Sequence, residues 1–222
     1  DETFIVYEDE RYTFNETYQK SARMGRLLVD QYKIQSGDRV AISMRNYPEW
    51  IMAFTAVTSI GAIAVTLNAL WLTEEIEYGL NHSGAKLLIA DQERIDRVIP
   101  FYQRDGINVI AVRPGDNLPK DIPALEDLLS TIPNCDMPEV SIDPNDDATI
   151  LFTSGSTGHP KGAVSCHRNI ITALLSWELD QHAAMLVAGI EPPQNDYQVA
   201  TLLAVPLFHA TGSHAVYLSC YR

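Results

Sequence analysis

A ten-residue segment at positions 153–162 gathers side chains that could bind a polyanion. It reads TSGSTGHPKG, with four hydroxyl side chains, three glycines and one lysine, and it follows an apolar run at 148–152 that is typical of a buried strand. Glycines let backbone N–H groups approach a ligand, and successive N–H groups in such a turn form an anion-binding concavity. The hydroxyls add hydrogen-bond donors, and Lys161 adds a positive charge. The segment is therefore predicted to bind the phosphates of a nucleotide triphosphate.

Two other interpretations of this segment compete with that one. Clusters of Gly, Ser and Thr are usually plain surface loops, but such loops seldom place a lysine behind an X-Pro bond. A Walker A loop requires G-x-x-x-x-G-K-[ST], whereas here the residue five after Gly155 is Pro160, and Lys161 is followed by Gly162. A Walker loop also opens a helix, and residues 163–166 are instead typical of a short strand. We expect a phosphate loop of another kind.

Two motifs, TSGSTGHPKG at 153–162 and PLFHATG at 206–212, together resemble those of the adenylate-forming superfamily. That superfamily comprises acyl-CoA synthetases, peptide-synthetase adenylation domains and firefly-type luciferases. TSGSTGHPKG, continued as AV-x-x-H-x-N up to Asn169, resembles the phosphate loop of that family. Residues 206–212 (PLFHATG) resemble its aromatic-histidine motif beside the acyl and adenylate pocket. The resemblance implies an α/β fold of mostly parallel sheets flanked by helices, with residues 1–222 forming the amino-terminal part of the large domain.

The resemblance also implies a reaction and a set of site residues. A carboxylate attacks the α-phosphate of ATP to give an acyl-adenylate and pyrophosphate, and a thiol then displaces AMP. Donors and cations preset around the phosphate oxygens stabilise that transition state. His209 is the expected catalytic residue, orienting the acyl group, and Thr157 is expected to help bind Mg²⁺. The residues expected to hold the β- and γ-phosphates are Thr153, Ser154, Gly155, Ser156, Thr157, Gly158 and Lys161.

Three functions stay open at this point. The favoured one is an AMP-forming acyl-CoA synthetase that uses ATP, Mg²⁺ and coenzyme A on a small-molecule carboxylic acid. The others are a peptide-synthetase-type adenylation domain that loads a carrier protein, and a non-catalytic binding module with the same fold. The family's adenine-binding motif, ribose-binding aspartate and small carboxyl-terminal domain have no counterpart in these 222 residues. We therefore expect this polypeptide alone to be inactive, and exposed sheet edges could let it self-associate.

Composition excludes several classes of protein. The chain is 46% hydrophobic and 20% charged, as in ordinary globular domains, and its net charge of −13 without a basic block argues against nucleic-acid binding. Three widely spaced cysteines form neither a disulfide framework nor a zinc site, which fits a cytoplasmic setting. Residues 51–72 carry no charge and could span a bilayer by length, but Gly61 divides them into a helix and a buried strand. No transmembrane segment is expected.

Alternating strand and helix patterns predict a mostly parallel sheet covered on both faces. Residues 45–47 are expected to be a solvated loop without a role, residues 133–147 an exposed connector, and Thr73 a helix cap. The predicted strands are 3–7, 11–13, 39–44, 62–67, 86–90, 107–112, 148–152, 163–166 and a buried strand at 198–205. The predicted helices are 13–32 with a Thr13–Glu16 capping box, 48–60, 73–82, 92–103, 122–129, 167–188 with a buried stripe of Ile170, Leu174, Leu175 and Leu179, and one from 213.

Overall fold

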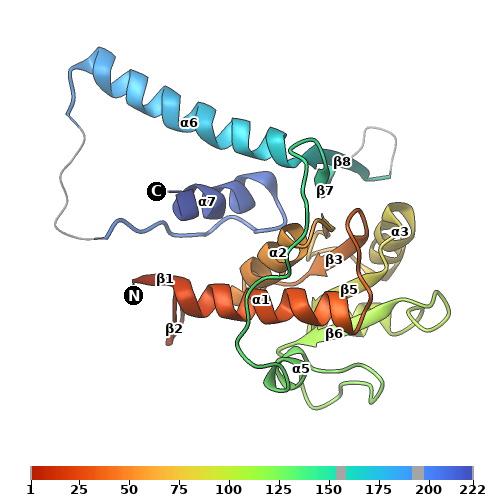
Figure 1. Cartoon of the computed structure of the whole chain (residues 1–222). Coiled ribbons are helices and arrows are strands. Elements are labelled where there is room, and N and C mark those ends of the chain that lie inside the picture. The colour runs from red at the N-terminus through yellow and green to blue at the C-terminus, as the bar shows by residue number, and fades with distance from the viewer. Residues whose placement is uncertain (1, 154–158, 192–197, 222) are drawn as a thin grey trace.

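The computed structural model describes residues 2–153, 159–191 and 198–221. A sheet of mostly parallel strands lies between two layers of helices, with a separate hairpin near the amino terminus (Figure 1). The elements are β1 (Thr3–Tyr7), β2 (Glu10–Thr13), α1 (Phe14–Asp30), β3 (Arg39–Ser43), α2 (Pro48–Ser59), β4 (Ile63–Thr66), α3 (Thr73–Ser83), β5 (Leu87–Asp91), α4 (Gln92–Val98), β6 (Asn108–Val112), α5 (Leu125–Ser130), β7 (Asp147–Thr153), β8 (Lys161–Cys166), α6 (His167–Ala188) and α7 (Ala210–Tyr221).

The six-stranded sheet has the order β6-β5-β3-β4-β7-β8, and only the β7–β8 pair is antiparallel. Because successive side chains of a strand point to opposite faces, Val40 and Ile42 pack under α1 and α2, whereas Ala41 packs under α3 and α4. Burial of both faces explains why the central strands are almost continuously apolar. The predicted mostly parallel α/β architecture is confirmed.

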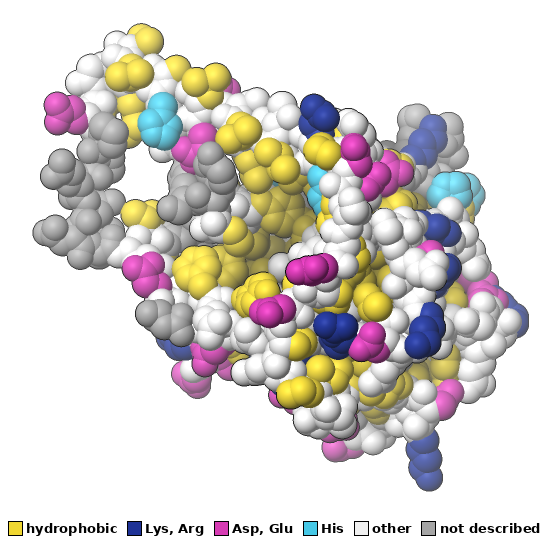
Figure 2. All heavy atoms as spheres, viewed as in Figure 1, with side chains coloured by type: hydrophobic (Ala, Val, Ile, Leu, Met, Phe, Trp, Pro, Cys, Tyr) yellow, Lys and Arg dark blue, Asp and Glu magenta, His cyan; other side chains and the backbone are white. Residues whose placement is uncertain are grey.

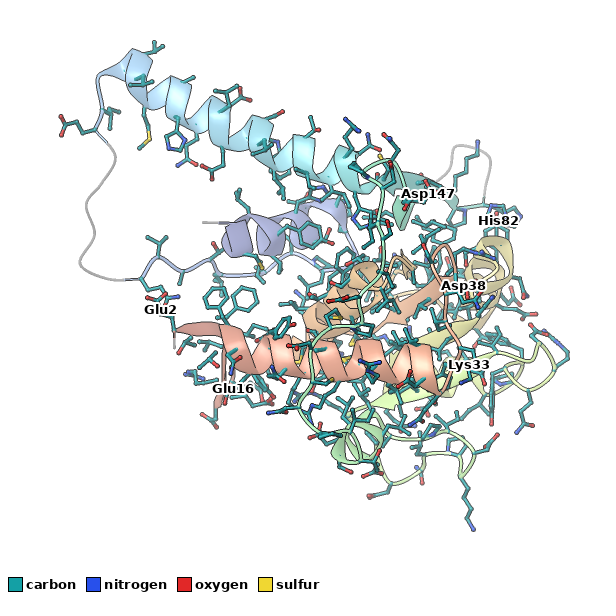
Figure 3. All side chains as sticks on the ribbon, viewed as in Figure 1. Glu2, Glu16, Lys33, Asp38, His82 and Asp147 are labelled. Carbon is teal, nitrogen blue, oxygen red and sulfur yellow. The ribbon has the colours of Figure 1, made fainter. Side chains whose placement is uncertain are left out.

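Several local predictions are confirmed by the geometry of the helix ends. Thr13 caps α1 in a capping box with Glu16, which lies at the amino end of the helix in Figure 3. Pro48 occupies the first turn of α2, and Gly84 ends α3 with a left-handed φ of 64°. None of the helices in the described ranges is long and apolar enough to cross a membrane.

Three predicted boundaries are wrong, each for a local reason. Thr73 is the first residue of α3, and the backbone N–H of Leu72 is satisfied by Glu75 at 2.9 Å. Helix α4 ends at Val98 because Pro100 has no N–H with which to continue the hydrogen-bond ladder, although Ile99 before it keeps helical dihedrals of −45° and −41°. Helix α5 begins at Leu125, because the preceding residues pair with β6 instead, through the Ala111 N–H and the Pro123 carbonyl oxygen at 2.9 Å.

The buried strand predicted at 198–205 is wrong. These residues belong to no strand, the Ala204 N–H turns back onto the Leu202 carbonyl oxygen at 3.2 Å, and Leu202 is 93% exposed. A strand needs a neighbour that supplies a ladder of backbone hydrogen bonds. Here a side chain, that of Asn46, binds the carbonyl oxygens of Leu203 and Val205 instead.

The buried stripe predicted along α6 is also wrong. Of its four members only Leu174 is buried, and Leu179 is 69% exposed. The helix contacts β8 and α7 and then extends away from the sheet (Figure 1). Apolar side chains are consequently visible over α6 and between it and the rest of the chain (Figure 2). The exposed apolar residues of α6 are Ile171, Leu175, Trp177, Leu179, Leu186 and Val187.

The segment between α5 and β7 contains no helix or strand in the part of the chain that the structure describes, and most of it is exposed. Its middle nevertheless packs on α1, where the Met137 N–H donates to the Tyr18 hydroxyl at 3.2 Å. A Cβ added at Gly25 would lie 2.8 Å from Met137 Sδ, so the close approach of this segment to α1 depends on glycine.

Candidate functional site

The carboxyl ends of the parallel strands lie at one edge of the sheet, which is where open α/β sheets bind ligands. Strand β7 leads into the predicted phosphate loop, and β4 lies next to β7 with Thr66 opposite Leu151. The residues that follow β4, from Leu67 onward, therefore lie beside the loop that follows β7.

The two ends of the phosphate loop are held together by the β7–β8 pair. Thr153 pairs with Lys161, and the Thr153 hydroxyl donates to the Lys161 carbonyl oxygen at 3.3 Å. Gly162 lies directly against Ile150, since a Cβ at Gly162 would be 2.7 Å from Ile150 Cγ2. Because the chain continues as strand β8 and not as a helix, the Walker A alternative is excluded.

Lys161 is exposed at the start of β8 and forms no ion pair with any residue in the described ranges. A lysine without a carboxylate partner is free to bind a ligand anion, so this end of the loop fits a phosphate. The other predicted ligands, including the Mg²⁺ ligand Thr157, lie outside the described residues: Ser154, Gly155, Ser156, Thr157 and Gly158. No group of metal-ligating side chains occurs elsewhere in the described part of the chain.

The aromatic-histidine motif lies at the end of β4. The hydroxyl of Thr66, the last residue of that strand, donates to the carbonyl oxygen of Phe208 at 3.3 Å. His209 follows in a turn, with its N–H bonded to the Pro206 carbonyl oxygen at 3.1 Å, and its side chain is exposed. A Cβ at Gly212 would lie 2.2 Å from that same carbonyl oxygen, so only glycine allows the first turn of α7 to pack there. The fold thus places His209 at the edge that also carries Thr153 and Lys161.

Asn46 was expected to lie in a solvated loop, and this expectation is wrong. Its side chain forms hydrogen bonds with the backbone of residues 203–207, immediately before the motif. The clue in the sequence is its position: residues 45–47 follow β3, and loops at the carboxyl ends of parallel strands commonly face ligands. Spacing along the chain could not reveal a partner that is 161 residues away.

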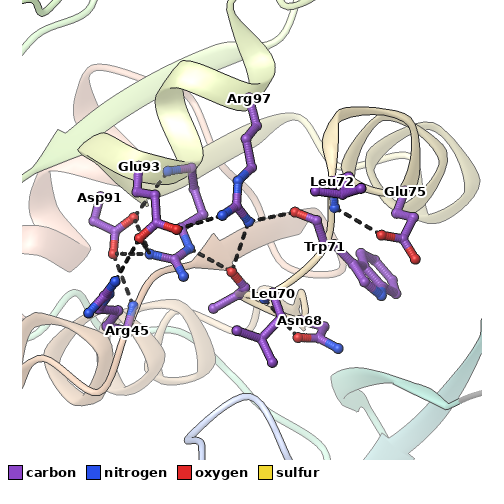
Figure 4. A network of polar contacts seen from close by, with 11 residues as sticks. Arg45, Asn68, Leu70, Trp71, Leu72, Glu75, Asp91, Glu93 and Arg97 are labelled. Atoms are coloured by element: carbon purple, nitrogen blue, oxygen red, sulfur yellow. Dashed lines mark hydrogen bonds and ion pairs between the residues drawn. The ribbon is translucent and has the colours of Figure 1, made fainter.

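A buried ionic network stiffens the same edge (Figure 4). Arg94, 2% exposed, pairs with Asp91 at 3.1 Å and donates to the Ala69 carbonyl oxygen at 2.7 Å. Arg97 donates to the carbonyl oxygens of Ala69 and Trp71 at 3.1 and 2.6 Å. These bonds fix residues 68–72, which directly follow β4.

The network also reaches β3 and β7. Asp91 Oδ2 accepts the backbone N–H of Arg45 at 3.0 Å, and the Arg45 guanidinium pairs with Glu93 at 2.9 Å. The rings of Trp71 and Phe152 meet edge to face with centroids 5.1 Å apart. These contacts connect the loops after β3 and β4 with each other and with the end of β7.

Two further features lie at opposite ends of β8: His159 precedes the strand, and His167 follows it. His159 stacks on Tyr78 of α3 with ring centroids 5.1 Å apart, and His82, labelled in Figure 3, stacks on the same tyrosine at 5.0 Å. His167, the first residue of α6, is half-buried, and burial lowers the pKa of its imidazole. Its Nε2 atom is buried and has no hydrogen-bond partner among the described residues. The sequence alone carried no signal for the role of Tyr78.

An apolar pocket of about 510 Å³ lies beside the motif. The hairpin strand β1, the start of α2 and the extended segment 198–203 enclose it, and Leu207 and Val216 of the motif region contribute to its wall. Asn46 also lines the pocket.

Comparison with known proteins agrees with this architecture. A family model described as AMP-binding enzyme matches residues 1–222. The chain is 27% identical over 221 residues to 4-coumarate–CoA ligase 2 of Oryza sativa subsp. japonica, covering 95% of this chain and 37% of that protein. It is 29% identical over 216 residues to 2-succinylbenzoate–CoA ligase of Bacillus velezensis, covering 97% and 38%. The chain thus spans little more than a third of the length of these curated relatives.

Solved structures give the same result. A putative long-chain-fatty-acid CoA ligase from Rhodopseudomonas palustris superposes with a TM-score of 0.77 at 25% identity, covering 99% of this chain and 51% of that one. O-succinylbenzoate coenzyme A synthetase from Bacillus subtilis, in complex with ATP and magnesium ion, superposes with a TM-score of 0.72 at 26% identity and the same coverage. With a family match over its full length, this chain belongs to the AMP-binding enzyme family.

Proposed function

We propose that this chain is part of an AMP-forming acyl-CoA synthetase, which converts a carboxylic acid, ATP and CoA into acyl-CoA, AMP and pyrophosphate. One observation carries the proposal: the Thr66–Phe208 hydrogen bond places the histidine motif at the end of β4, next to the strand that leads into the phosphate loop. The names of the relatives, which are CoA ligases, favour CoA over a carrier-protein thiol as the acceptor.

In this proposal different residues bind different parts of the substrates. The hydroxyls and glycines of 153–158 and the Lys161 ammonium hold the β- and γ-phosphates, and Thr157 contributes to the binding of Mg²⁺. His209 orients the carboxylate of the acid for attack on the α-phosphate. The substrate ATP supplies the adenylyl group: a bond forms between the carboxylate oxygen and the α-phosphorus, and the bond from that phosphorus to pyrophosphate breaks. The protein's contribution is positive charge and hydrogen-bond donors set in place around the phosphate oxygens, which stabilises the charge that develops in the transition state.

We further propose that residues 1–222 alone supply the phosphate side of the site and do not complete the reaction. The proposal rests on the absence from this sequence of the family's adenine, ribose and catalytic-lysine motifs. Formation of AMP that depends on a carboxylic acid, measured with the 222-residue polypeptide alone, would contradict it.

The test of the function uses both the full-length gene product and this chain. The full-length protein should release AMP only when an acid is present, and should form a thioester with CoA. Calorimetric titration of the chain with ATP–Mg²⁺ should show binding that the substitution Lys161→Ala weakens about 10- to 100-fold, since a charge-assisted contact is lost. Lys120→Ala is the matched control, because this exposed lysine follows β6, at the far end of the sheet from β8. Equal loss in both variants would argue against a phosphate site at Lys161.

A further inference from the structure

We propose that Asn46 is a positioning residue for His209: its side chain holds the backbone that leads into the histidine motif. The inference rests on the proposed function, in which His209 orients the acyl carboxylate, and it assigns a role to a residue that does not itself touch the substrate.

The side-chain amide of Asn46 is fully used in binding this backbone. Its Nδ2 donates to the carbonyl oxygen of Val205 at 2.9 Å and to that of Leu203 at 3.3 Å. Its Oδ1 accepts the N–H of Leu207 at 2.9 Å. The donor and the acceptor of one amide thus bind a single stretch of backbone, as a neighbouring strand would.

Asn46 is itself held firmly. The N–H of Arg45 is bound by the buried Asp91 carboxylate at 3.0 Å. On the other side, the N–H of Tyr47 bonds to the Arg45 carbonyl oxygen at 2.7 Å, and Pro48 begins α2. The asparagine therefore extends from a short turn fixed between β3 and α2, and it can impose its geometry on the partner segment.

The restraint passes from Leu207 to His209 over two residues whose backbone is hydrogen-bonded. Leu207 is 2% exposed, and the Thr66 hydroxyl holds the next carbonyl oxygen, that of Phe208. The His209 N–H then closes a turn onto the Pro206 carbonyl oxygen at 3.1 Å. Since residues 198–205 belong to no strand, the amide of Asn46 replaces the missing ladder just before this turn.

The chemistry of the side chain explains why an amide is suited to this place. An aspartate would lose both donors and would place negative charge against two carbonyl oxygens, and an alanine would leave all three backbone groups without their partner. Displacement of the segment would move His209 without removing any group that contacts substrate. The expected signature is a lower rate with a fold that stays intact.

The first experiment observes His209 directly in the 222-residue chain. The Hε1 resonance of His209, assigned by its absence in His209→Ala, should move in Asn46→Ala and Asn46→Asp, while that of the remote His182 should not. Asn68→Ala is the matched control, because among the described residues its side chain binds only the local Leu70 N–H, at 2.9 Å. An unchanged His209 resonance in folded Asn46 variants would overturn the proposal. The unmodified chain gives a check that needs no variant: the Leu207 amide should exchange slowly with solvent, and fast exchange would overturn the proposal as well.

The second experiment is a double-mutant cycle in the full-length gene product. Asn46→Ala should lower kcat for acid-dependent AMP formation roughly 10- to 100-fold, with little change in KM for ATP, as expected for a misplaced catalytic group. In a His209→Ala background the same substitution should have almost no further effect, because the residue through which it acts is gone. Additive losses would overturn the inference. If the unmodified full-length protein forms no AMP with any acid, the proposed function fails, and the resonance and exchange measurements still decide whether Asn46 places His209.

Discussion

The Thr66 hydroxyl donates a hydrogen bond to the Phe208 carbonyl oxygen across 142 residues of sequence, at 3.3 Å. Thr66 is 2% exposed and ends the strand next to β7. This contact holds residues 206–212 at the end of the strand that neighbours β7. Replacing Thr66 with valine keeps the shape of the side chain and leaves the carbonyl oxygen without this donor. We expect a loss of about 1 kcal/mol in the free energy of unfolding, measured with urea.

Thr58→Val provides the control for that substitution. The hydroxyl of Thr58 donates to the Phe54 carbonyl oxygen within its own helix, at 2.9 Å, and so joins no separate parts of the fold. A shift of the His209 resonance in Thr66→Val but not in Thr58→Val would support the role of Thr66. If the His209 resonance has the same position in Thr66→Val and in Thr58→Val, Thr66 does not hold the motif.

The stack of His159 on Tyr78 predicts a second effect. Tyr78→Ala removes the ring that holds the residue two positions before Lys161, whereas Tyr78→Phe keeps it. Because such ring pairs contribute about 0.5–1.5 kcal/mol, ATP–Mg²⁺ binding by the chain should weaken about 2- to 10-fold in Tyr78→Ala only. His82→Ala, which removes the other ring stacked on Tyr78, should leave the affinity unchanged. Equal affinities of Tyr78→Ala and the unmodified chain would contradict this account.

The buried pair of Arg94 and Asp91 predicts a large effect on stability. Their side chains are 2% and 5% exposed, so Arg94→Met leaves a buried carboxylate without its counter-charge. We expect the free energy of unfolding to fall by about 3–5 kcal/mol. The double variant Asp91→Asn, Arg94→Met removes both charges, keeps an oxygen for the Arg45 N–H, and should recover part of the loss. Arg104→Ala, at an exposed ion pair with Glu77, is the control and should change stability little.

The contact of Glu10 with Arg113 predicts a dependence on pH. The pKa of Glu10 is lowered from 4.5 to about 2, chiefly by hydrogen bonds from the Arg113 guanidinium and to a lesser extent by one from the Tyr12 hydroxyl. A carboxylate whose pKa is lower in the folded state stabilises the protein fully above its unfolded pKa. That contribution is lost as pH falls from about 4.5 to about 2.

The measurement compares the unmodified chain with Glu10→Gln in urea at several pH values. The unmodified chain should be more stable at pH 7, and the difference should shrink below pH 4.5. The difference should be modest, because the Glu10 side chain is 34% exposed and solvent screens the pair. A difference that stays constant from pH 7 to pH 3 would show that Glu10 stabilises the hairpin by another route.

The sequence by itself determined the features that depend on neighbouring residues. The capping box of Thr13 and Glu16, the glycine that ends α3 and the apolar strands of the sheet all follow from side-chain shape, backbone preference and periodicity. The residue types of 153–162 and 206–212 indicated a phosphate loop and a histidine motif, because few other functions need those residues at that spacing. The family match is consistent with that interpretation.

Only the tertiary structure decided which segments meet. The apolar residues of α6 have the spacing of a buried stripe, yet burial requires a second surface, and the described chain covers only Leu174. Residues 198–205 have the composition of a strand, yet a strand also requires a partner strand with free backbone groups. Here the side chain of Asn46 binds the carbonyl oxygens of Leu203 and Val205 instead. The local sequence pattern indicates which side chains a segment can bury and which hydrogen bonds it can form. The partner is set by packing across more than a hundred residues, which no short window of sequence contains.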